Sequence, residues 1–136
     1  MPEILQAILG TKKAMATIAV KDVEVARTFY EGTLGLQSTG PNQPGVLSFA
    51  SADTMVLVYE SQYAGTNKAT AATWLIDSST EGGIEGAVIA LKDKGVTFEH
   101  YDLPQTTRQG DVHVAGKTKV AWFKDPDGNI LSIVSE

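Results

Sequence analysis

The sequence contains no cysteine. This absence excludes disulfides, thiolate metal sites, iron–sulfur clusters and cysteine nucleophiles, and it fits a reducing compartment, so we expect a cytoplasmic protein. Positive charge is also scarce, because 16 Asp and Glu residues against 11 Lys and Arg residues give a net charge of −5. This balance opposes attraction to nucleic-acid phosphates and to anionic lipid, so we expect neither as a partner.

Long hydrophobic runs are missing as well. The apolar run at residues 55–59 is typical of this chain, whereas a membrane-spanning helix needs roughly 18 apolar residues. At the N-terminus Glu3 comes early and Lys12 and Lys13 come late, which is unlike the basic start and apolar stretch of a signal peptide. We therefore expect neither membrane insertion nor an export signal.

The length and composition predict a single folded domain over residues 1–136. The chain is 43% hydrophobic and 20% charged, and a chain of this size can bury a sizeable core. Within that domain we predict an N-terminal helical segment at residues 1–12, a first module at residues 13–62 and a second module at residues 70–136.

An apolar stripe marks the predicted N-terminal helix. It consists of Ile4, Leu5, Ile8 and Leu9. A helix of about two turns is not stable alone in water, so the stripe must pack on something. Pairing of two copies of the chain would bury it, and we therefore predict a homodimer.

The first module reads as a strand, a helix and a hairpin. Residues 13–20 predict a strand, and Asp22 is a good N-cap for a helix that ends near Gly35, a residue able to take the left-handed conformation. The apolar runs 46–50 and 55–59 predict a hairpin. The small and polar residues 61–71 are typical of a linker or a mobile flap.

The second module repeats this order. Residues 73–76 predict a strand, the hydroxyls of residues 78–80 are candidate N-caps, and a helix follows that ends before Gly95. Its apolar face consists of Ile84, Ala87, Val88 and Leu91.

Three further strands and one polar stretch complete the second module. Strands are predicted at residues 96–101, 117–123 and 129–134, the last two joined by a turn at residues 125–128. The polar stretch 105–117 is typical of a lid.

The two helix-ending glycines, Gly35 and Gly95, lie about 60 residues apart, which indicates an internal repeat. Neither half could bury both faces of its own sheet. We therefore predict an α+β fold of two βαβββ modules that share a curved mixed sheet, with helices on one side and a concave ligand cavity on the other.

Two motifs carry a resemblance to a known family. VKDVEVARTFYEGTLGL at residues 20–36 and AWFKDPDGNILSIVSE at residues 121–136 resemble the strand-to-helix entry and the final hairpin of the glyoxalase/bleomycin resistance/dioxygenase superfamily, also called the vicinal oxygen chelate fold. The resemblance covers roughly residues 13–136. It implies the fold but leaves the function open, because this scaffold hosts isomerases, lyases, ring-cleaving dioxygenases, thiol transferases and drug-sequestering proteins.

In metal-dependent members the resemblance implies three or four His, Glu or Gln ligands on equivalent strands of the two halves. The corresponding positions here are Met15, Leu57, residues 71–73 and Ser132, none of which is His, Glu or Gln. Because these side chains are poor ligands for a catalytic metal ion, we predict no metal and no other cofactor.

A rearranged metal site remains the alternative. It would use His100 or His113, the only two histidines, together with Glu60 or Glu99.

Strand alternation predicts which residues line the cavity. The predicted ligand pocket consists of Met15, Thr17, Leu57, Tyr59, Trp74, Trp122 and Ser132. The two tryptophans can equally be core residues, and one of them can face the pocket.

We assign no catalytic residue. Candidates for acid–base chemistry are Tyr59, Glu60, Tyr101, Arg108 and His113. Each is more simply explained as surface or loop chemistry.

The sequence is compatible with three functions. The first is metal-independent binding of a small apolar or aromatic molecule, in the manner of a drug-sequestering protein. The second is a glyoxalase-like lyase, isomerase or dioxygenase with an unrecognised or rearranged metal site. The third is association of the domain with itself or with a partner.

Overall fold

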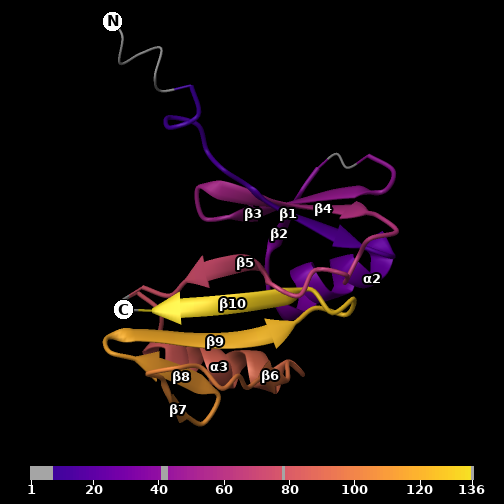
Figure 1. Ribbon diagram of the computed structural model, residues 1–136. Helices are drawn as coiled ribbons and strands as arrows, with labels where there is room; N and C mark the ends of the chain where they lie inside the picture. Colours follow the sequence, from indigo (N-terminus) through magenta and orange to yellow (C-terminus); the bar gives the residue numbers. More distant parts are fainter. Residues whose placement is uncertain (1–7, 41–42, 78, 136) are drawn as a thin grey trace, which may run out of the picture.

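A computed structural model describes residues 8–40, 43–77 and 79–135 (Figure 1). Most of the predicted N-terminal helix, including Ile4 and Leu5, lies outside the described residues. The two described members of its stripe, Ile8 and Leu9, lie in a turn and are 70% and 79% exposed. No helix in the described ranges is long and apolar enough to span a membrane.

The first module contains a strand, a two-part helix and three further strands. These are β1 (Ala16–Val20), α2 (Val23–Arg27), η1 (Thr28–Thr33), β2 (Gln37–Thr39), β3 (Val46–Ser51) and β4 (Thr54–Glu60). Asp22 caps the helix as predicted, because its side chain accepts a hydrogen bond of 2.8 Å from the backbone N–H of Glu24. The predicted hairpin is β3–β4, whereas β2 is a short polar strand that the sequence did not predict.

The second module repeats the order with additional strands. These are β5 (Thr70–Leu75), α3 (Gly83–Asp93), β6 (Phe98–Glu99), β7 (Thr107–Gln109), β8 (Val112–Ala115), β9 (Thr118–Lys124) and β10 (Ile130–Ser135). The predicted hydroxyl N-cap of its helix is wrong, since α3 begins after Gly82, a left-handed residue without a side-chain cap. Most of the polar stretch 105–117, which the sequence predicted as a lid, forms the β7–β8 hairpin.

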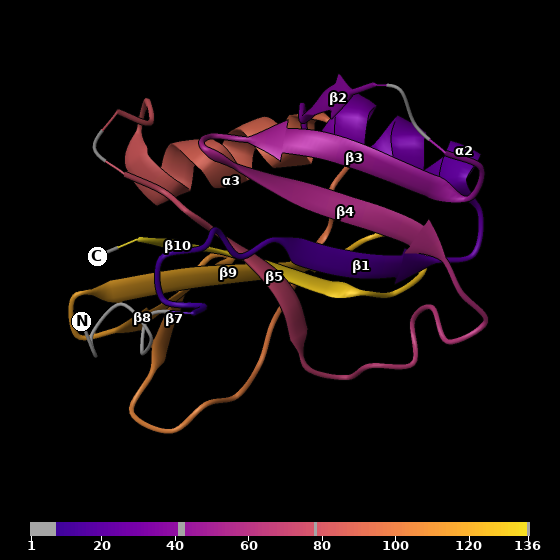
Figure 2. The same ribbon diagram turned by 90° about the horizontal axis from the view of Figure 1, so that it is seen from above.

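The predicted α+β fold of two modules is confirmed. The described strands form two hydrogen-bonded ladders, with orders β1-β4-β3-β2 and β5-β10-β9-β8-β7. Strands β1 and β5 lie next to each other at the seam between the ladders. Figure 2 shows the helices on one side of the strands and the connections β4–β5 and β6–β7 on the opposite side, which we call the open face.

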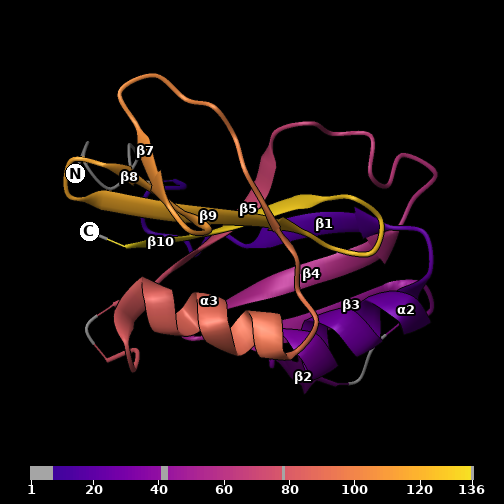
Figure 3. The same cartoon turned by 90° about the horizontal axis from the view of Figure 1, so that it is seen from below.

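One core fills the space between the helices and the strands of both modules. Alternate residues of each central strand point into it, such as Ile18 and Val20 of β1 and Leu131 and Ile133 of β10. Figure 3 shows α2 and α3 on the same side of the strands. Residues between these core positions therefore face the open side.

A buried hydrogen-bond network joins the two modules. The Tyr30 hydroxyl donates to Oδ2 of Asp125 at 2.7 Å, and Oδ1 of Asp125 accepts from the backbone N–H groups of Asp127 and Asn129. The Asn129 amide donates to Oδ2 of Asp125 and to the carbonyl of Ala19 in β1, both at 2.8 Å. Burial and the adjacent Asp125 carboxylate raise the pKa of the Tyr30 phenol, so the phenol stays a donor.

The β4–β5 connection packs against the same turn. Ala64 is buried, and Gly65 has a φ of +74°. A Cβ at Gly65 would overlap the carbonyl oxygen of Asp127. This connection is therefore a linker held against the second module at these residues.

Replacing the Tyr30 hydroxyl should weaken the junction between the modules. We expect Tyr30→Phe to lower the free energy of unfolding by about 2 kcal/mol, because a buried carboxylate loses a charge-assisted donor. Chemical denaturation followed by circular dichroism measures this change. Tyr63→Phe is the matched control, since Tyr63 is 68% exposed, and equal stability losses in the two variants would contradict the role of Tyr30.

Candidate functional site

The first-module part of the predicted pocket lies on the open face of β1 and β4. Thr17 is paired with Leu57, and Tyr59 is paired with Ala19. Tyr59 is 36% exposed, Leu57 is half-buried, and Met15, just before β1, is 47% exposed. The strands thus bring Thr17, Leu57 and Tyr59 onto one surface.

The second-module part lies on β5, β9 and β10. Ser132 is 2% exposed and is paired with Thr73 on one side and with Trp122 on the other. The hydroxyls of Ser132 and Thr73 are hydrogen-bonded to each other at 2.8 Å. The indole N–H of Trp122 donates to the Thr70 hydroxyl at 3.2 Å.

The two tryptophans lie on opposite faces. Trp74 is paired with the core residue Ile133 and packs against the helix-side core. There it lines an apolar hollow of about 290 Å³ together with Ala87 and Leu91 of α3. Only Trp122 therefore shares the open face with Ser132.

An aromatic cluster occupies the open face of the second module. The Trp122 ring makes edge-to-face contacts with Tyr101, at a centroid distance of 5.2 Å, and with His113, at 4.8 Å. Beside Trp122 and Tyr101 lies a pocket of about 340 Å³, whose other lining consists of Lys68, Ala69, Thr70, Leu103 and Ile130. This volume and lining are typical of a site for a small, largely apolar molecule.

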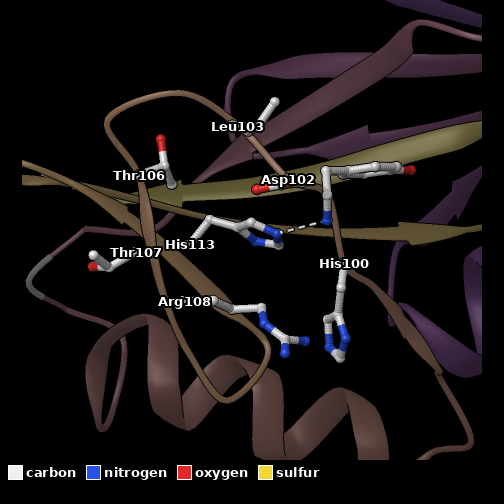
Figure 4. A pocket seen from close by; sticks show the side chains of 8 residues that line it. His100, Asp102, Leu103, Thr106, Thr107, Arg108 and His113 are labelled. Carbon is white, nitrogen blue, oxygen red and sulfur yellow. Dashed lines mark hydrogen bonds between the residues drawn. The ribbon is translucent and has the colours of Figure 1, made fainter.

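His113 lines a second cavity of about 460 Å³, shown in Figure 4, which has Tyr101 and Leu103 in common with the aromatic pocket. The side chain is 2% exposed. Its Nε2 accepts a hydrogen bond of 3.0 Å from the backbone N–H of Tyr101, so the ring carries its proton on Nδ1. Within the described ranges Nδ1 is buried and has no hydrogen-bond partner.

Comparison with known proteins identifies the family. The family model of the Glyoxalase/Bleomycin resistance protein/Dioxygenase superfamily matches residues 13–133. The chain belongs to this superfamily. A search of curated proteins finds no match.

Solved structures of the superfamily share the fold. A glyoxalase/bleomycin resistance protein from Streptomyces sp. CB03234 has 22% identity and a TM-score of 0.62, with 90% of this chain and 98% of that chain covered. A lactoylglutathione lyase from Agrobacterium tumefaciens has 14% identity and a TM-score of 0.66, with 92% and 93% covered.

An integron cassette protein from the mobile metagenome of the Halifax Harbour sewage outfall has 19% identity and a TM-score of 0.66, with 93% of this chain and 99% of that chain covered. At these identities the structural likenesses establish the fold alone.

The residues at the metal positions of the superfamily do not fit a catalytic metal ion. Met15 offers a thioether, Leu57 a hydrocarbon, and the Thr73 and Ser132 hydroxyls are hydrogen-bonded to each other. Catalytic divalent ions need about three nitrogen or carboxylate donors that converge on one point. Among the described residues, no group of three His, Cys, Asp or Glu side chains could hold a metal ion.

The residues of the rearranged site have other partners or lie elsewhere. Glu99 lies 3.7 Å from the Lys124 ammonium, and His100 Nε2 lies 2.7 Å from Oδ1 of Asp111. Glu60 is the last residue of β4 in the first module, whereas His100 follows β6 and His113 lies in β8 of the second module. The described residues therefore bring the two histidines near each other but do not join them with Glu60 or Glu99 into a group of three donors.

An ion-pair network anchors the hairpin that carries His113. Asp111, between β7 and β8, accepts hydrogen bonds from Lys92 of α3 at 2.8 Å and from His100. These two hydrogen bonds lower the pKa of Asp111 below its ordinary value. The network ties the β7–β8 hairpin to α3.

Sequence reasoning underestimated His113, which it treated as surface or loop chemistry. The side chain is buried because Val112 and Val114 point toward the core and His113, between them, packs on Trp122. The alternation of Val112, His113 and Val114 is the strand signal that could have revealed it. Arg108, its cross-strand partner, is exposed but lines the same cavity.

The Asp111 network should stabilise the fold in a pH-dependent manner. We expect Asp111→Asn to lower the unfolding free energy at pH 7 by about 0.5–1 kcal/mol, since the pairs are partly exposed. The depressed pKa means that this contribution is present above the unfolded-state pKa and is lost as the pH falls through the folded-state pKa.

Urea denaturation of both proteins from pH 7 into the acid range measures the difference. Asp53→Asn, an exposed position in the β3–β4 turn, is the matched control. A wild-type advantage that stays constant at acid pH would contradict the assigned linkage.

Proposed function

We propose that the protein binds a small apolar or aromatic molecule on its open face without a metal ion. The observation that carries this proposal is the pair of Thr73 and Ser132, whose hydroxyls bond each other at 2.8 Å. In metal-dependent relatives these strand positions would supply ligands. Here the two hydroxyls are hydrogen-bonded to each other, and neither is a nitrogen or carboxylate donor of the kind that a catalytic metal ion needs.

The aromatic pocket supports the same function. Trp122 presents a large ring next to Tyr101, and Leu103 and Ile130 complete an apolar wall. A planar aromatic molecule can stack or pack edge-on in such surroundings, with roughly 0.5–1.5 kcal/mol per aromatic pair beyond the burial of area. Met15, Thr17, Leu57 and Tyr59 extend the surface across the seam as proposed further contacts. We assign no catalytic residue.

The alternative is a lyase, isomerase or dioxygenase with a rearranged metal site. One observation favours it: the rings of His100 and His113 lie 6.4 Å apart, next to the same cavity. It predicts tight, stoichiometric metal in the purified protein.

A nuclear magnetic resonance titration tests the binding proposal. The neutral probe naphthaleneacetamide should shift the indole N–H resonance of Trp122 and leave that of Trp74 in place, because only Trp122 faces the proposed pocket. Trp74→Phe assigns the two signals and serves as the matched control. Trp122→Ala should weaken binding at least about tenfold through loss of the stacking surface.

The same titration with and without a chelator addresses the metal. Equal affinity in both conditions supports metal-independent binding. A stoichiometric metal ion whose removal abolishes binding would establish the alternative, and a probe that moves neither indole signal would contradict the aromatic pocket.

We further propose a cytoplasmic homodimer. The exposed Ile8 and Leu9 support self-association, because pairing of two copies would remove apolar side chains from water. Light scattering at micromolar concentration should give the mass of two chains. The double variant Ile8→Ser and Leu9→Ser should shift the mass toward one chain, and a wild-type mass of one chain would refute the dimer.

A further inference from the structure

The cavity beside His113 contains groups that the binding of an apolar molecule leaves unexplained. It is lined by His100, Tyr101, Asp102, Leu103, Thr106, Thr107, Arg108 and His113, and its volume is about 460 Å³. Nδ1 of His113 is a buried donor without a described partner, and the exposed Arg108 places its guanidinium at the same cavity. Both come from the β7–β8 hairpin, where Arg108 and His113 are directly paired.

We propose that this cavity binds the carboxylate of an aromatic ligand whose ring lies against Trp122, so that the ligand is an aromatic carboxylate. This inference rests on the proposed function, because it places the ring in the aromatic pocket. The two cavities have Tyr101 and Leu103 in common. A ligand that passes these residues reaches both Trp122 and His113.

The chemistry of His113 favours an anionic acceptor. Its Nε2 is already bonded to the Tyr101 backbone, which fixes the proton on Nδ1 as a buried donor. A buried donor without an acceptor destabilises the protein. A charged acceptor forms a stronger hydrogen bond with it than a neutral acceptor does. Nδ1 is covered, so the ligand oxygen must reach it through a small displacement of residues 102–106, which contain no regular secondary structure and lie beyond the Tyr101 hydrogen bond.

Charge distribution orients the ligand. Arg108 provides a guanidinium that can hold a carboxylate with two parallel hydrogen bonds. The His100 ring is already engaged by Asp111, which Lys92 also binds. In Figure 4 the Asp102 carboxylate and Leu103 lie on the opposite side of the His113 ring from the Arg108 guanidinium, so repulsion by Asp102 directs an anion toward Arg108.

A pair of matched ligands tests the inference. Naphthaleneacetate and naphthaleneacetamide have the same ring and nearly the same shape, but only the first carries a charge at neutral pH. We expect the carboxylate to bind at least about tenfold more tightly, since a charge-assisted pair at a partly buried site contributes that much. Arg108→Gln should remove this preference and leave the affinity for the amide within about twofold.

Arg27→Gln is the matched control, because Arg27 is the other arginine of the chain and its guanidinium faces Glu24 on the α2 surface. It should leave both affinities unchanged. His113→Gln should also reduce the carboxylate preference, and in the wild type the Nδ1–H resonance of His113 should slow its exchange with water when the carboxylate binds.

The outcomes separate this inference from the proposed function. Equal affinity for the two ligands, with no effect of Arg108→Gln, would overturn the carboxylate site and leave the aromatic pocket in place, with a water molecule as the partner of Nδ1. A Trp122 signal that responds to neither ligand would overturn the aromatic pocket itself. Circular dichroism of each variant verifies that it is folded.

Discussion

The hydrogen bond between Tyr30 and Asp125 is the constraint on which the arrangement of the two modules depends. It joins η1 of the first module to the turn between β9 and β10, and Asn129 extends the network to the carbonyl of Ala19 in β1. A buried carboxylate is tolerated only when its lone pairs are satisfied, and here four donors reach Asp125. The two sequence motifs that carry the family resemblance therefore contact each other in space.

This junction fixes the open face. Because Asn129 holds the start of β10 against β1, the strands on both sides of the seam keep their registers, and Ser132 is held next to Thr73 and Trp122. No hydrogen-bonded ladder of the described strands crosses the seam between β1 and β5. The two modules are consequently held together by side-chain contacts in the shared core and by this polar network, whereas strand pairing holds each module together internally.

Local signals predicted much of the fold. The cap at Asp22, the left-handed Gly35 and Gly95, and the turn before β10 act through their own backbone geometry, so the sequence alone indicates them. The short strands β2 and β7 carry no such signal, because polar residues form them only when a neighbouring strand offers a ladder. The sequence also left undecided which faces Trp74 and Trp122 occupy. The face of Trp74 follows from its pairing with Ile133 of a neighbouring strand, which the sequence alone does not give.

The sequence predicted which side chains lie on the open face near the seam between β1 and β5. It did not predict the burial of His113 in the β7–β8 hairpin. Alternation identified Ser132 as an open-face residue, whereas the burial of His113 arises from Trp122 and Tyr101, which the fold brings to it from other strands and loops. At the seam the Thr73 and Ser132 hydroxyls are hydrogen-bonded to each other, while among the described residues Nδ1 of His113 is a buried donor without a partner. Because a buried donor without a partner gains most from a polar ligand group, polar recognition of the proposed ligand is expected at the β7–β8 hairpin.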